Sequence, residues 1–533
     1  MLNEPTRVTV PSGGGLGEAH ASKTGRLENQ VHIVATSPPH LAGRSVEGAS
    51  STVSGGGKTL LVGTAQSVKQ LAAALMQTVP APCIVGCVLV KPAAITDVPV
   101  WGTLDELDTF CCKPEVDRVL LSLPAVMGPA IAQAAKILTQ SGVVWSAIQT
   151  LDDQLISSAG QPAVMAGGAF DVSRLIDRTP RPLDDQAIGA AITGRRVMVT
   201  GAGGSIGSEL AMRVASYGPS ELTLVERSEN ALFEIDGRLR DQYPDLTRHT
   251  VLHDITHADR TSRLLSRVRP QVVFHAAAHK HVPMMEDHPA LAVENNFFGT
   301  RSVADAAAAA GCERFVMIST DKAVNPSSVM GATKRLAELY IQHLDRVTDT
   351  TFCMVRFGNV LGSACSLIPI WSKQLASGGP LTVTHRDMTR YFMTIPEAAG
   401  LVLQAGAYAT GAEVFLLDMG EPVRIVDMAD RFLRQHGMAP GVDVDIKFTG
   451  PRPGEKLFEE LAYRGEDMAT TAHSSIRRWR TAVPEAAFVQ QVVATFDRMR
   501  FDAEERGGEL NPTAVVAALR AAVPEMITSV AVA

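Results

Sequence analysis

An aspartate and a lysine stand side by side after a strand-like apolar run, in the segment Ser319-Thr-Asp-Lys. When such a pair is buried, desolvation favours the neutral form of both side chains, so Asp321 can donate a proton and Lys322 can accept one. Nearby Lys334 would further disfavour a positive charge on Lys322. The alternative is a pair of ordinary charges in a surface loop, and the strand end argues against it. We therefore expect an acid–base pair with a protonated carboxyl and a neutral amine.

A glycine-rich turn, Gly201-Ala-Gly-Gly-Ser-Ile-Gly, joins a strand expected at 195–200 to a helix through Glu209. Such a turn directs backbone amides and the positive end of a helix toward an anion. Gly201 would end the strand, Gly204 would leave room for a pyrophosphate, and Gly207 would let the helix approach the sheet. The turn predicts a bound dinucleotide, contacted by Gly201, Gly204, Ser205, Ile206 and Gly207.

The ends of the next strands suit the rest of a dinucleotide. Glu226 ends the following strand, where a carboxylate can accept both hydrogen bonds of an adenosine ribose and would repel the extra phosphate of NADP. This favours NAD, although the adjacent Arg227 leaves the choice open. Asp254 and Ile255 are expected to lie beside the adenine. Ala276 and Ala277, at the end of a later strand, have small side chains that would let the nicotinamide lie close.

Met330 and Lys334 lie four residues apart, which places both on one face of a helix. Lys334 would then reach the ribose of the nicotinamide. A methionine is usually core filling. The stretch resembles the active-site signature of the extended short-chain dehydrogenases, however, and this resemblance implies that Met330 stands where their Tyr-x-x-x-Lys pair has its tyrosine. Because Met330 cannot take a proton, another group must do so.

The composition excludes several classes of protein. The 533 residues are 46% hydrophobic and 20% charged, enough for two ordinary cores. The net charge is −7 and the isoelectric point about 6.1, so no basic field attracts nucleic acid or anionic lipid. The most apolar stretch, 119–135, is broken by Pro124 and Pro129, so we expect no integral membrane segment. Without a signal region or zinc-type cysteine spacing, we expect a cytoplasmic protein with reduced thiols.

Apolar periodicity divides the chain into four parts. Residues 1–57, rich in glycine, serine, threonine and proline, predict a disordered leader. A small α/β domain is expected over 58–178 and a Pro-rich linker over 179–189. Residues 190–533 predict an NAD-binding domain with a substrate lobe, C-terminal helices and one doubly wound parallel sheet, whose strands are expected at 195–200, 222–226, 271–275, 314–319 and 352–357.

The small domain begins like a nucleotide-binding unit but lacks its full turn. Gly63 follows the first strand, yet the further glycines that let a backbone approach a phosphate are absent from the residues after it. We therefore favour packing or assembly over nucleotide binding for this domain.

Three histidines in His275-Ala-Ala-Ala-His-Lys-His suggest a metal site at first sight. They run from a strand end into a loop and need not converge, and no carboxylate or thiolate spacing completes a ligand set, so we expect no metal. His275 fits a buried histidine with satisfied hydrogen bonds. Lys280 and His281 are expected to border the substrate.

From about 188 to 525 the chain resembles the UDP-N-acetylglucosamine 4,6-dehydratases of polysaccharide biosynthesis, among the extended short-chain dehydrogenases. It is most similar to the large branch in which methionine replaces the catalytic tyrosine. Residues 59–178 resemble the small α/β domain that precedes the catalytic part in that branch. The motifs are Glu226-Arg-Ser-Glu-Asn-Ala-Leu, His275-Ala-Ala-Ala-His-Lys-His-Val-Pro, Asn296-Phe-Phe-Gly-Thr, Ser319-Thr-Asp-Lys, Arg356-Phe-Gly-Asn-Val-Leu-Gly-Ser, Arg390-Tyr-Phe-Met-Thr and Arg452-Pro-Gly-Glu-Lys.

The resemblance implies oxidation of a sugar at C4 by hydride transfer to NAD, loss of water across C5 and C6, and return of the hydride to C6. It assigns Asp321 as the acid at O6, Lys322 as the group acting at C5, and Thr320 as the hydrogen-bond partner of O4. It also implies retained configuration at C5. Either Thr320 relays the O4 proton to water or a neighbouring group takes it directly.

The implied substrate is a UDP-sugar, and the fold implies a homo-oligomer. Arg390 and Arg452 would grip the diphosphate with planar guanidinium groups, unless they are isolated surface arginines. The chain departs from the branch in lacking its amino-terminal membrane helices and in having Cys365 at a usual glycine position. The residues expected to bind the substrate are Lys280, His281, Asn359, Arg390, Arg452 and Glu455.

Two other functions fit part of the pattern. A nucleotide-sugar 4-epimerase shares the cofactor, the fold and the C4 oxidation, but it needs no acid at O6, so the Asp-Lys pair argues against it. An inactive NAD-binding scaffold of a polysaccharide assembly complex would account for Met330, for Cys365 and for the incomplete first glycine turn.

Overall fold

The computed structural model describes most of the chain from residue 57 onward. The expected leader over 1–57 lies outside the described residues, except for Gly57 and a two-residue strand. The described ranges are 57–77, 81–148, 175–176, 178, 181–436, 438–461, 468–479 and 484–527, together with that strand, β1 (Ala35–Thr36).

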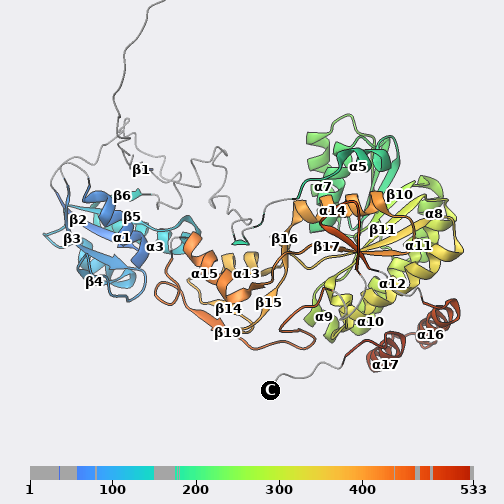
Figure 1. Cartoon of the computed structure of the whole chain (residues 1–533). Helices are drawn as coiled ribbons and strands as arrows, with labels where there is room; N and C mark the ends of the chain where they lie inside the picture. The colour runs from blue at the N-terminus through green and yellow to red at the C-terminus, as the bar shows by residue number, and fades with distance from the viewer. Residues whose placement is uncertain are drawn as a thin grey trace, which may run out of the picture.

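The small domain is a largely parallel sheet with covering helices, as the alternating pattern predicts (Figure 1, blue). Its strands lie in the order β1-β6-β5-β2-β3-β4, and only β1 and β6 pair antiparallel. Leu60 and Val62 join one apolar cluster and Leu61 another, because successive strand residues face opposite sides. The elements are β2 (Lys58–Gly63), α1 (Ala65–Leu75), β3 (Cys83–Leu89), β4 (Val100–Thr103), α2 (Leu107–Cys111), β5 (Arg118–Ser122), α3 (Gly128–Ser141) and β6 (Val144–Ile148).

The turn after β2 serves packing. A side chain on Gly63 would stand 2.4 Å from the carbonyl oxygen of Ser122, so only glycine fits between α1 and β5. The amino end of α1 is capped by Thr64 and by a carboxylate of the substrate lobe, because Asp443 Oδ1 accepts a hydrogen bond from Ala65 N at 2.8 Å. That carboxylate stands at the helix end where a turn of this type would bind a phosphate.

We expect Asp443→Ala to loosen the contact between the small domain and the substrate lobe. Asp443 Oδ2 also accepts a hydrogen bond from Ala439 N at 2.8 Å, so the substitution removes two hydrogen bonds to a buried carboxylate and about 1–3 kcal/mol of stabilisation. Limited proteolysis between the domains measures the effect, with the exposed Asp445→Ala as control. Equal cleavage of the two variants would contradict the expectation.

The second domain is built on a nine-stranded, mostly parallel sheet, which confirms the predicted doubly wound fold. The strand order is β20-β21-β17-β12-β11-β10-β7-β8-β9, and β20 and β21 run antiparallel to their neighbours. The sequence pattern does not predict β9, because this strand of the sheet edge is largely exposed and lacks a continuous apolar run. The strands are β7 (Arg196–Thr200), β8 (Glu221–Glu226), β9 (Arg248–Leu252), β10 (Val272–His275), β11 (Arg314–Ile318), β12 (Thr351–Arg356), β17 (Glu413–Leu417), β20 (Met468–Thr470) and β21 (Ile476–Trp479).

Helices cover both faces of this sheet, because its strand residues alternate between two apolar clusters. Along β7, Val197 and Val199 pack on one face and Met198 on the other. The first face carries α5 (Asp185–Ile192), α6 (Ser205–Ser216), α7 (Glu229–Gln242) and α14 (Ile395–Tyr408). The second face carries α8 (Ala258–Val268), α11 (Gly299–Ala309) and α12 (Val329–Val347), with α16 (Ala486–Glu505) and α17 (Pro512–Ala522) against α12.

Helix α5 occupies part of the expected linker over 179–189. Asp184 caps the helix, with Oδ1 accepting a hydrogen bond from Ala187 N at 3.0 Å, and Ile188 and Ile192 are buried. The chain is therefore helical from Asp185 onward, because burial of an apolar stripe and a good cap stabilise a helix that the preceding prolines do not interrupt.

The substrate lobe lies between the small domain and the large sheet (Figure 1). Trp371 and Phe432 are fully buried in it, with ring centroids 5.6 Å apart. Both belong to the same apolar cluster as Leu121 of the small domain, so the lobe and the small domain share a core. Its elements are β13 (Asn359–Leu361), α13 (Leu367–Ala376), β14 (Leu381–Val383), β15 (Thr389–Arg390), β16 (Phe392–Thr394), β18 (Val423–Arg424), α15 (Ile425–Gln435) and β19 (Ile446–Phe448).

The residues singled out by the sequence gather at the carboxyl ends of the parallel strands. The strand order reverses between β7 and β10, and the chains leaving these strands diverge to leave a crevice. Gly201 follows β7, Ala276 follows β10, and Thr320 comes just after β11. The tertiary fold thus brings the glycine turn and the Asp-Lys pair to one edge.

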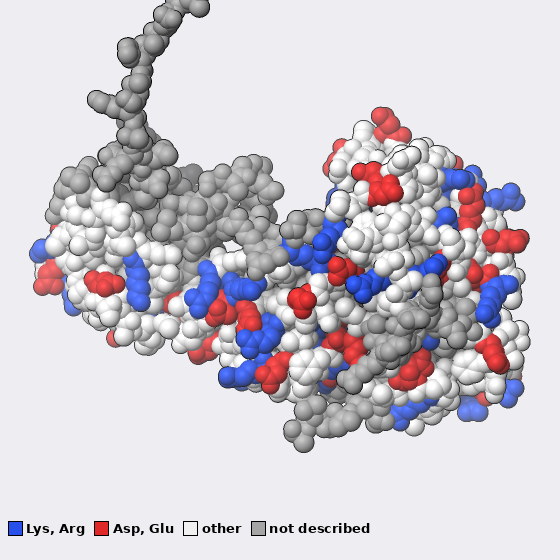
Figure 2. All heavy atoms as spheres, in the orientation of Figure 1, with Lys and Arg blue, Asp and Glu red and all other residues white. Residues whose placement is uncertain are grey.

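The surface carries both signs of charge. Figure 2 shows Lys and Arg interspersed with Asp and Glu among the described residues of the face that is drawn. Of the helices that the structure describes, none is both long and apolar enough to cross a membrane.

Candidate functional site

The glycine-rich turn brings β7, β10 and α6 together at backbone distance. Gly201 has φ +64°, and a side chain there would stand 2.7 Å from the backbone of Ala277. A side chain on Gly207 would stand 1.9 Å from the carbonyl oxygen of Gly201. Both positions therefore require glycine. Helix α6 begins at Ser205, so its amino end, with Ile206, faces the turn.

Two further glycines have different tasks in this turn. A side chain on Gly203 would stand 2.4 Å from Ala231 Cβ, so Gly203 is needed for packing on α7. A side chain on Gly204 would meet only the carbonyl oxygen of Gly201, at 3.2 Å. Gly204 therefore keeps the turn open on its outer side, where the sequence pattern places a pyrophosphate.

Three backbone amides fix the carboxylate of Glu226 beside the turn. Its Oε2 accepts a hydrogen bond from Gly203 N at 3.1 Å, and its Oε1 accepts from Arg227 N at 2.9 Å and Ser228 N at 3.0 Å. The Arg227 guanidinium contacts His279, with Nη2 2.6 Å from Nε2. A fixed negative charge at this strand end suits a ribose with both hydroxyls free.

Asp254 and Ile255 follow β9 at the same edge. Asp254 Oδ1 accepts hydrogen bonds from Thr256 N at 2.9 Å and from Thr256 Oγ1 at 2.8 Å. Burial raises the pKa of Asp254, but these hydrogen bonds outweigh burial and lower it below its usual range. Ile255 is buried and packs on Gly299. The side chain of Ile255 therefore belongs to the core, and only the backbone at this position can border a ligand.

These residues fit a dinucleotide. The turn permits close backbone approach, the amino end of α6 can receive a pyrophosphate, and Glu226 can receive a ribose. Ala276 and Ala277 form a strand end without bulky side chains, beside Gly201. The fit rests on these positions and on the geometry of this crevice.

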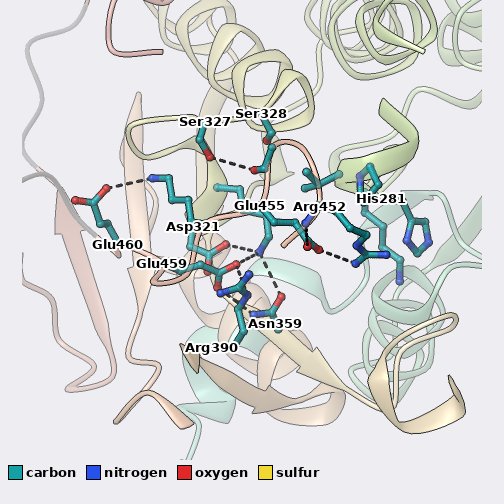
Figure 3. Close-up of a pocket in the computed structure, with 16 residues that line it drawn as sticks. His281, Asp321, Ser327, Ser328, Asn359, Arg390, Arg452, Glu455, Glu459 and Glu460 are labelled. Atoms are coloured by element: carbon teal, nitrogen blue, oxygen red, sulfur yellow. Dashed lines mark hydrogen bonds and ion pairs between the residues drawn. The ribbon is translucent and has the colours of Figure 1, made fainter. Parts of the chain in front are cut away.

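The Asp-Lys pair belongs to a cluster of charged side chains just after β11, in which Figure 3 labels Asp321, Glu459 and Arg390. Lys322 Nζ lies 3.1 Å from Asp321 Oδ1 and 2.7 Å from Glu459 Oε1. It also lies 3.3 Å from Asn359 Oδ1. Arg390 Nε lies 3.2 Å from Glu459 Oε1. The Asp321 side chain is fully buried, that of Glu459 is 4% exposed and that of Lys322 is 24% exposed, so the two carboxyl groups lie out of water while the lysine keeps partial access to it.

Glu459 is a functional residue that sequence reasoning misses. It follows the Arg452-Pro-Gly-Glu-Lys motif in a segment without regular secondary structure, among the glutamates Glu455 and Glu460. No local pattern distinguishes these three carboxylates. The signal is a contact across the fold, because Glu459 and Lys322, which follows β11, are far apart in the sequence and meet only in the tertiary structure.

The protonation of the cluster differs from the expectation for Lys322. Burial and, after it, the nearby Glu459 carboxylate together raise the pKa of Asp321 to about 7, against the opposing effect of Lys322. Burial lowers the pKa of Lys322, but Asp321 and Glu459 outweigh burial and raise it above its usual value. Burial raises the pKa of Glu459, but Lys322 and Arg390 lower it to about 2. The expectation of a neutral Lys322 is therefore wrong for the free site, because Asp321 and Glu459 together stabilise the ammonium.

The remaining catalytic candidates lie around this cluster. Thr320 Oγ1 donates a hydrogen bond to Asp321 Oδ1 at 2.9 Å. Met330 is 3% exposed and packs in the apolar cluster under the sheet. Lys334 is buried one turn further along α12, and burial lowers its pKa to about 8. Neither Met330 nor Lys334 lines the pocket around Asp321.

A buried ion pair supports the segment that carries Thr320. Glu338 Oε2 lies 2.5 Å from Arg356 Nη2 and 3.3 Å from Arg335 Nη1. Glu338 Oε1 accepts hydrogen bonds from Ser319 Oγ at 2.6 Å and from Arg356 Nε at 2.7 Å. Glu338 thus joins α12, β11 and β12 directly beneath the Asp-Lys pair.

An open pocket of about 170 Å³ brings together most of the expected substrate contacts. Arg390 Nη1 donates to the carbonyl oxygens of Thr389 and Leu457, at 2.7 and 3.2 Å, so the protein itself holds much of its guanidinium. Arg452 is 61% exposed, with Nη2 2.6 Å from Glu455 Oε1. The expected residues that line the pocket are Lys280, His281, Asp321, Lys322, Asn359, Arg390, Arg452 and Glu455.

The loop after β13 joins the pocket to the glycine turn. Lys280 Nζ donates to the carbonyl oxygen of Ala364 at 3.0 Å, and Ala364 N donates to Ser205 Oγ at 3.1 Å. Cys365 has φ +58°, a conformation that favours glycine. The backbone thus keeps the shape that a glycine would adopt, with an exposed thiol added.

His275 is a core histidine, as expected. It is fully buried between Thr200 Oγ1 at 2.7 Å and Thr300 Oγ1 at 3.0 Å, and burial lowers its pKa to about 3. Within the described ranges, no group of three histidine, cysteine, aspartate or glutamate side chains could hold a metal ion.

The fold and the site define a member of the nucleotide-sugar dehydratases and epimerases, on the extended short-chain dehydrogenase fold. The family described as "Polysaccharide biosynthesis protein" matches residues 197–481, and the chain belongs to this family. The X-ray structure of Pen from Bacillus thuringiensis aligns with a TM-score of 0.51 and 30% identity, covering 56% of this chain and 92% of that chain.

Curated relatives agree with this assignment. "Probable polysaccharide biosynthesis protein EpsC" of Bacillus subtilis is 44% identical over 70% of this chain and 62% of its own length. "Capsular polysaccharide biosynthesis protein CapD" of Staphylococcus aureus is 43% identical over 72% of this chain and 63% of its own length. The chain thus spans less than two thirds of these two proteins. "UDP-N-acetylglucosamine 4,6-dehydratase (inverting)" of Campylobacter jejuni is 30% identical over 50% of this chain and 77% of its own length.

Proposed function

We propose that the protein is an NAD-dependent 4,6-dehydratase of a UDP-sugar. The substrate proposed is UDP-N-acetylglucosamine and the product is UDP-2-acetamido-2,6-dideoxy-hexos-4-ulose, formed with retained C5 configuration for surface polysaccharide or glycan synthesis. The observation that carries the proposal is the buried Asp321 carboxyl, with a pKa of about 7, in contact with Lys322 at a strand end. A cytoplasmic homo-oligomer is part of the same proposal.

The crevice would hold the dinucleotide with the residues that fit it. The turn from Gly201 to Gly207 would receive the pyrophosphate, Glu226 the adenosine ribose, and Lys334 the nicotinamide ribose. When bound, NAD supplies reversible hydride exchange with the sugar at C4 and C6. The fixed carboxylate of Glu226 and the contact of the Arg227 side chain with His279 support NAD over NADP.

Asp321 and Lys322 would carry out the elimination as one unit. In the free site the proton between them rests on Lys322, 3.1 Å from Asp321 Oδ1. Its transfer to an ionised Asp321 gives a neutral amine and a protonated carboxyl without any change in total charge. Lys322 can then take the proton from C5, which an adjacent C4 ketone makes acidic, while Asp321 gives its proton to the departing O6. The C5–H and C6–O bonds break, and water leaves.

Thr320 is placed to serve O4. Its hydroxyl donates to Asp321 Oδ1 at 2.9 Å, which fixes it beside the pair. It can take the O4 proton and relay it to water, because Asp321 already receives the proton of Lys322 and a carboxyl group takes only one. Met330 contributes only apolar surface, which matches its burial in the core. This relay would replace the proton acceptor that a tyrosine supplies in related enzymes.

The product of one incubation tests the proposal. Purified protein with NAD and UDP-N-acetylglucosamine is expected to give a C6 methyl signal in the proton NMR spectrum. A product with inverted C4 and an intact C6 hydroxyl would show a 4-epimerase instead. That second candidate is kept because "UDP-glucose 4-epimerase" of Rickettsia rickettsii is 30% identical over 52% of this chain. No turnover with bound NAD would indicate an inactive scaffold.

A further inference from the structure

We infer that Glu459 is a positioning residue that sets the protonation and the orientation of the Asp321–Lys322 pair. The inference rests on the proposed dehydratase function and extends it to a residue outside the recognised motifs. Glu459 belongs to the segment that follows the exposed Arg452, whereas the Asp-Lys pair lies in the short helical turn Asp321–Ala323 that follows β11. Its carboxylate is therefore brought to the pair by the tertiary fold (Figure 3).

The contacts of Glu459 hold Lys322 in one place. Glu459 Oε1 lies 2.7 Å from Lys322 Nζ, and Glu459 Oε2 accepts a hydrogen bond from Asn359 Nδ2 at 3.0 Å. Asn359 Oδ1 in turn accepts from Lys322 Nζ at 3.3 Å. With Asp321 Oδ1 at 3.1 Å, the ammonium has three acceptors, which fix the amine beside the carboxyl that must exchange a proton with it.

The charges around Glu459 indicate how it acts on Asp321. The cations facing it are Lys322 from the turn after β11 and Arg390 from β15. The acidic neighbours are Asp321 and the phenol of Tyr391. Burial raises the pKa of Tyr391, and the carboxyl groups of Asp321 and Glu459 also raise it. Because the two cations keep Glu459 ionised, a permanent negative charge stands beside Asp321. That charge opposes a second one on Asp321 and favours its protonated form.

Asp321 is arranged to release its proton in one direction. Its Oδ1 accepts hydrogen bonds from Thr320 Oγ1 and Lys322 Nζ, at 2.9 and 3.1 Å. Its Oδ2 is buried and accepts no hydrogen bond from the described residues, while the carboxyl groups of Asp321 and Glu459 interact directly. Oδ2 lies against Gly358, where an added side chain would stand 3.1 Å away. In the proposed reaction the proton on Asp321, which the neighbouring charge of Glu459 favours, passes to the substrate O6.

The pH dependence of kcat/KM is the first readout. The reactive form of the Asp321–Lys322 pair holds one proton. The kcat/KM of the wild type should therefore rise as pH increases through about 7, where the doubly protonated pair loses one of its two protons. Glu459→Gln removes the charge that raises the pKa of Asp321, so the rise should move to lower pH by about 1–3 units. Glu460→Gln is the matched control, since Glu460 pairs with Lys456, and its rise should stay in place.

A substrate-free readout separates this inference from the proposed reaction. Infrared difference spectra of each protein against its Asp321→Asn variant report the protonated carboxyl of Asp321 directly. We expect the band to titrate near pH 7 in the wild type and at lower pH in Glu459→Gln. If the band shifts but no dehydration occurs in any variant, the proposed function fails and the role of Glu459 stands. If dehydration occurs and neither band nor rate profile shifts, the inference is overturned.

Glu459→Asp covers the case in which Glu459→Gln does not fold. It keeps the charge but withdraws it by one methylene, so both readouts should move in the same direction by a smaller amount. Circular dichroism establishes which variants are folded. A folded Glu459→Asp with wild-type profiles in both readouts would also overturn the inference.

Discussion

Lys322→Met is expected to lower kcat for dehydration by about 10²–10⁴-fold, the usual contribution of a positioned acid or base. The thioether has a similar length but cannot take the C5 proton, and it cannot pair with Glu459. Asp321→Asn should give a loss in the same range, because an amide cannot protonate O6. Product formation by proton NMR and incorporation of solvent deuterium at C5 measure both effects.

The two variants should remain folded and should still bind the dinucleotide. The glycine turn and Glu226 lie at other strand ends, and neither contacts the pair directly. Cofactor titration and thermal melting are the controls. Full dehydration by both variants would show that this pair is not the acid and base, even if the proposed reaction takes place.

Glu338→Ala is expected to destabilise the fold by about 3–5 kcal/mol, as removal of one partner from a buried ion pair does. Glu338 is fully buried, and its carboxylate is shared by Arg356, Arg335 and Ser319. The substitution leaves buried guanidinium groups without that carboxylate and removes the support beneath Thr320. Chemical denaturation measures the change in the free energy of unfolding.

Glu209→Ala is the control for this prediction. Glu209 pairs with Arg213 on the surface of α6, and both side chains are partly exposed, so its loss should cost about 0.3–0.5 kcal/mol. A Glu338→Ala variant as stable as Glu209→Ala would contradict the role given to the buried pair. Activity lost at temperatures well below the unfolding midpoint would indicate movement of the Asp-Lys segment.

The local sequence predicted those parts of the fold and site that depend on neighbouring residues in the chain. Apolar runs predicted β7, β8, β10, β11 and β12, because a strand buried on both faces needs continuous hydrophobic residues. The glycine turn could be predicted because the steric demands at Gly201 and Gly207 arise within one strand–turn–helix unit. The Asp-Lys pair could be found because it directly follows a buried strand.

Only the tertiary structure decided the state of that pair. Asp321 and Lys322 alone suggested two neutral groups, but the charges of Asp321 and of Glu459, which is more than a hundred residues away, together outweigh burial and raise the pKa of the lysine. Arg390 likewise binds Glu459 and backbone carbonyls instead of standing free for a diphosphate. Electrostatic energies depend on distances between side chains from separate elements, and no local pattern in the sequence contains those distances.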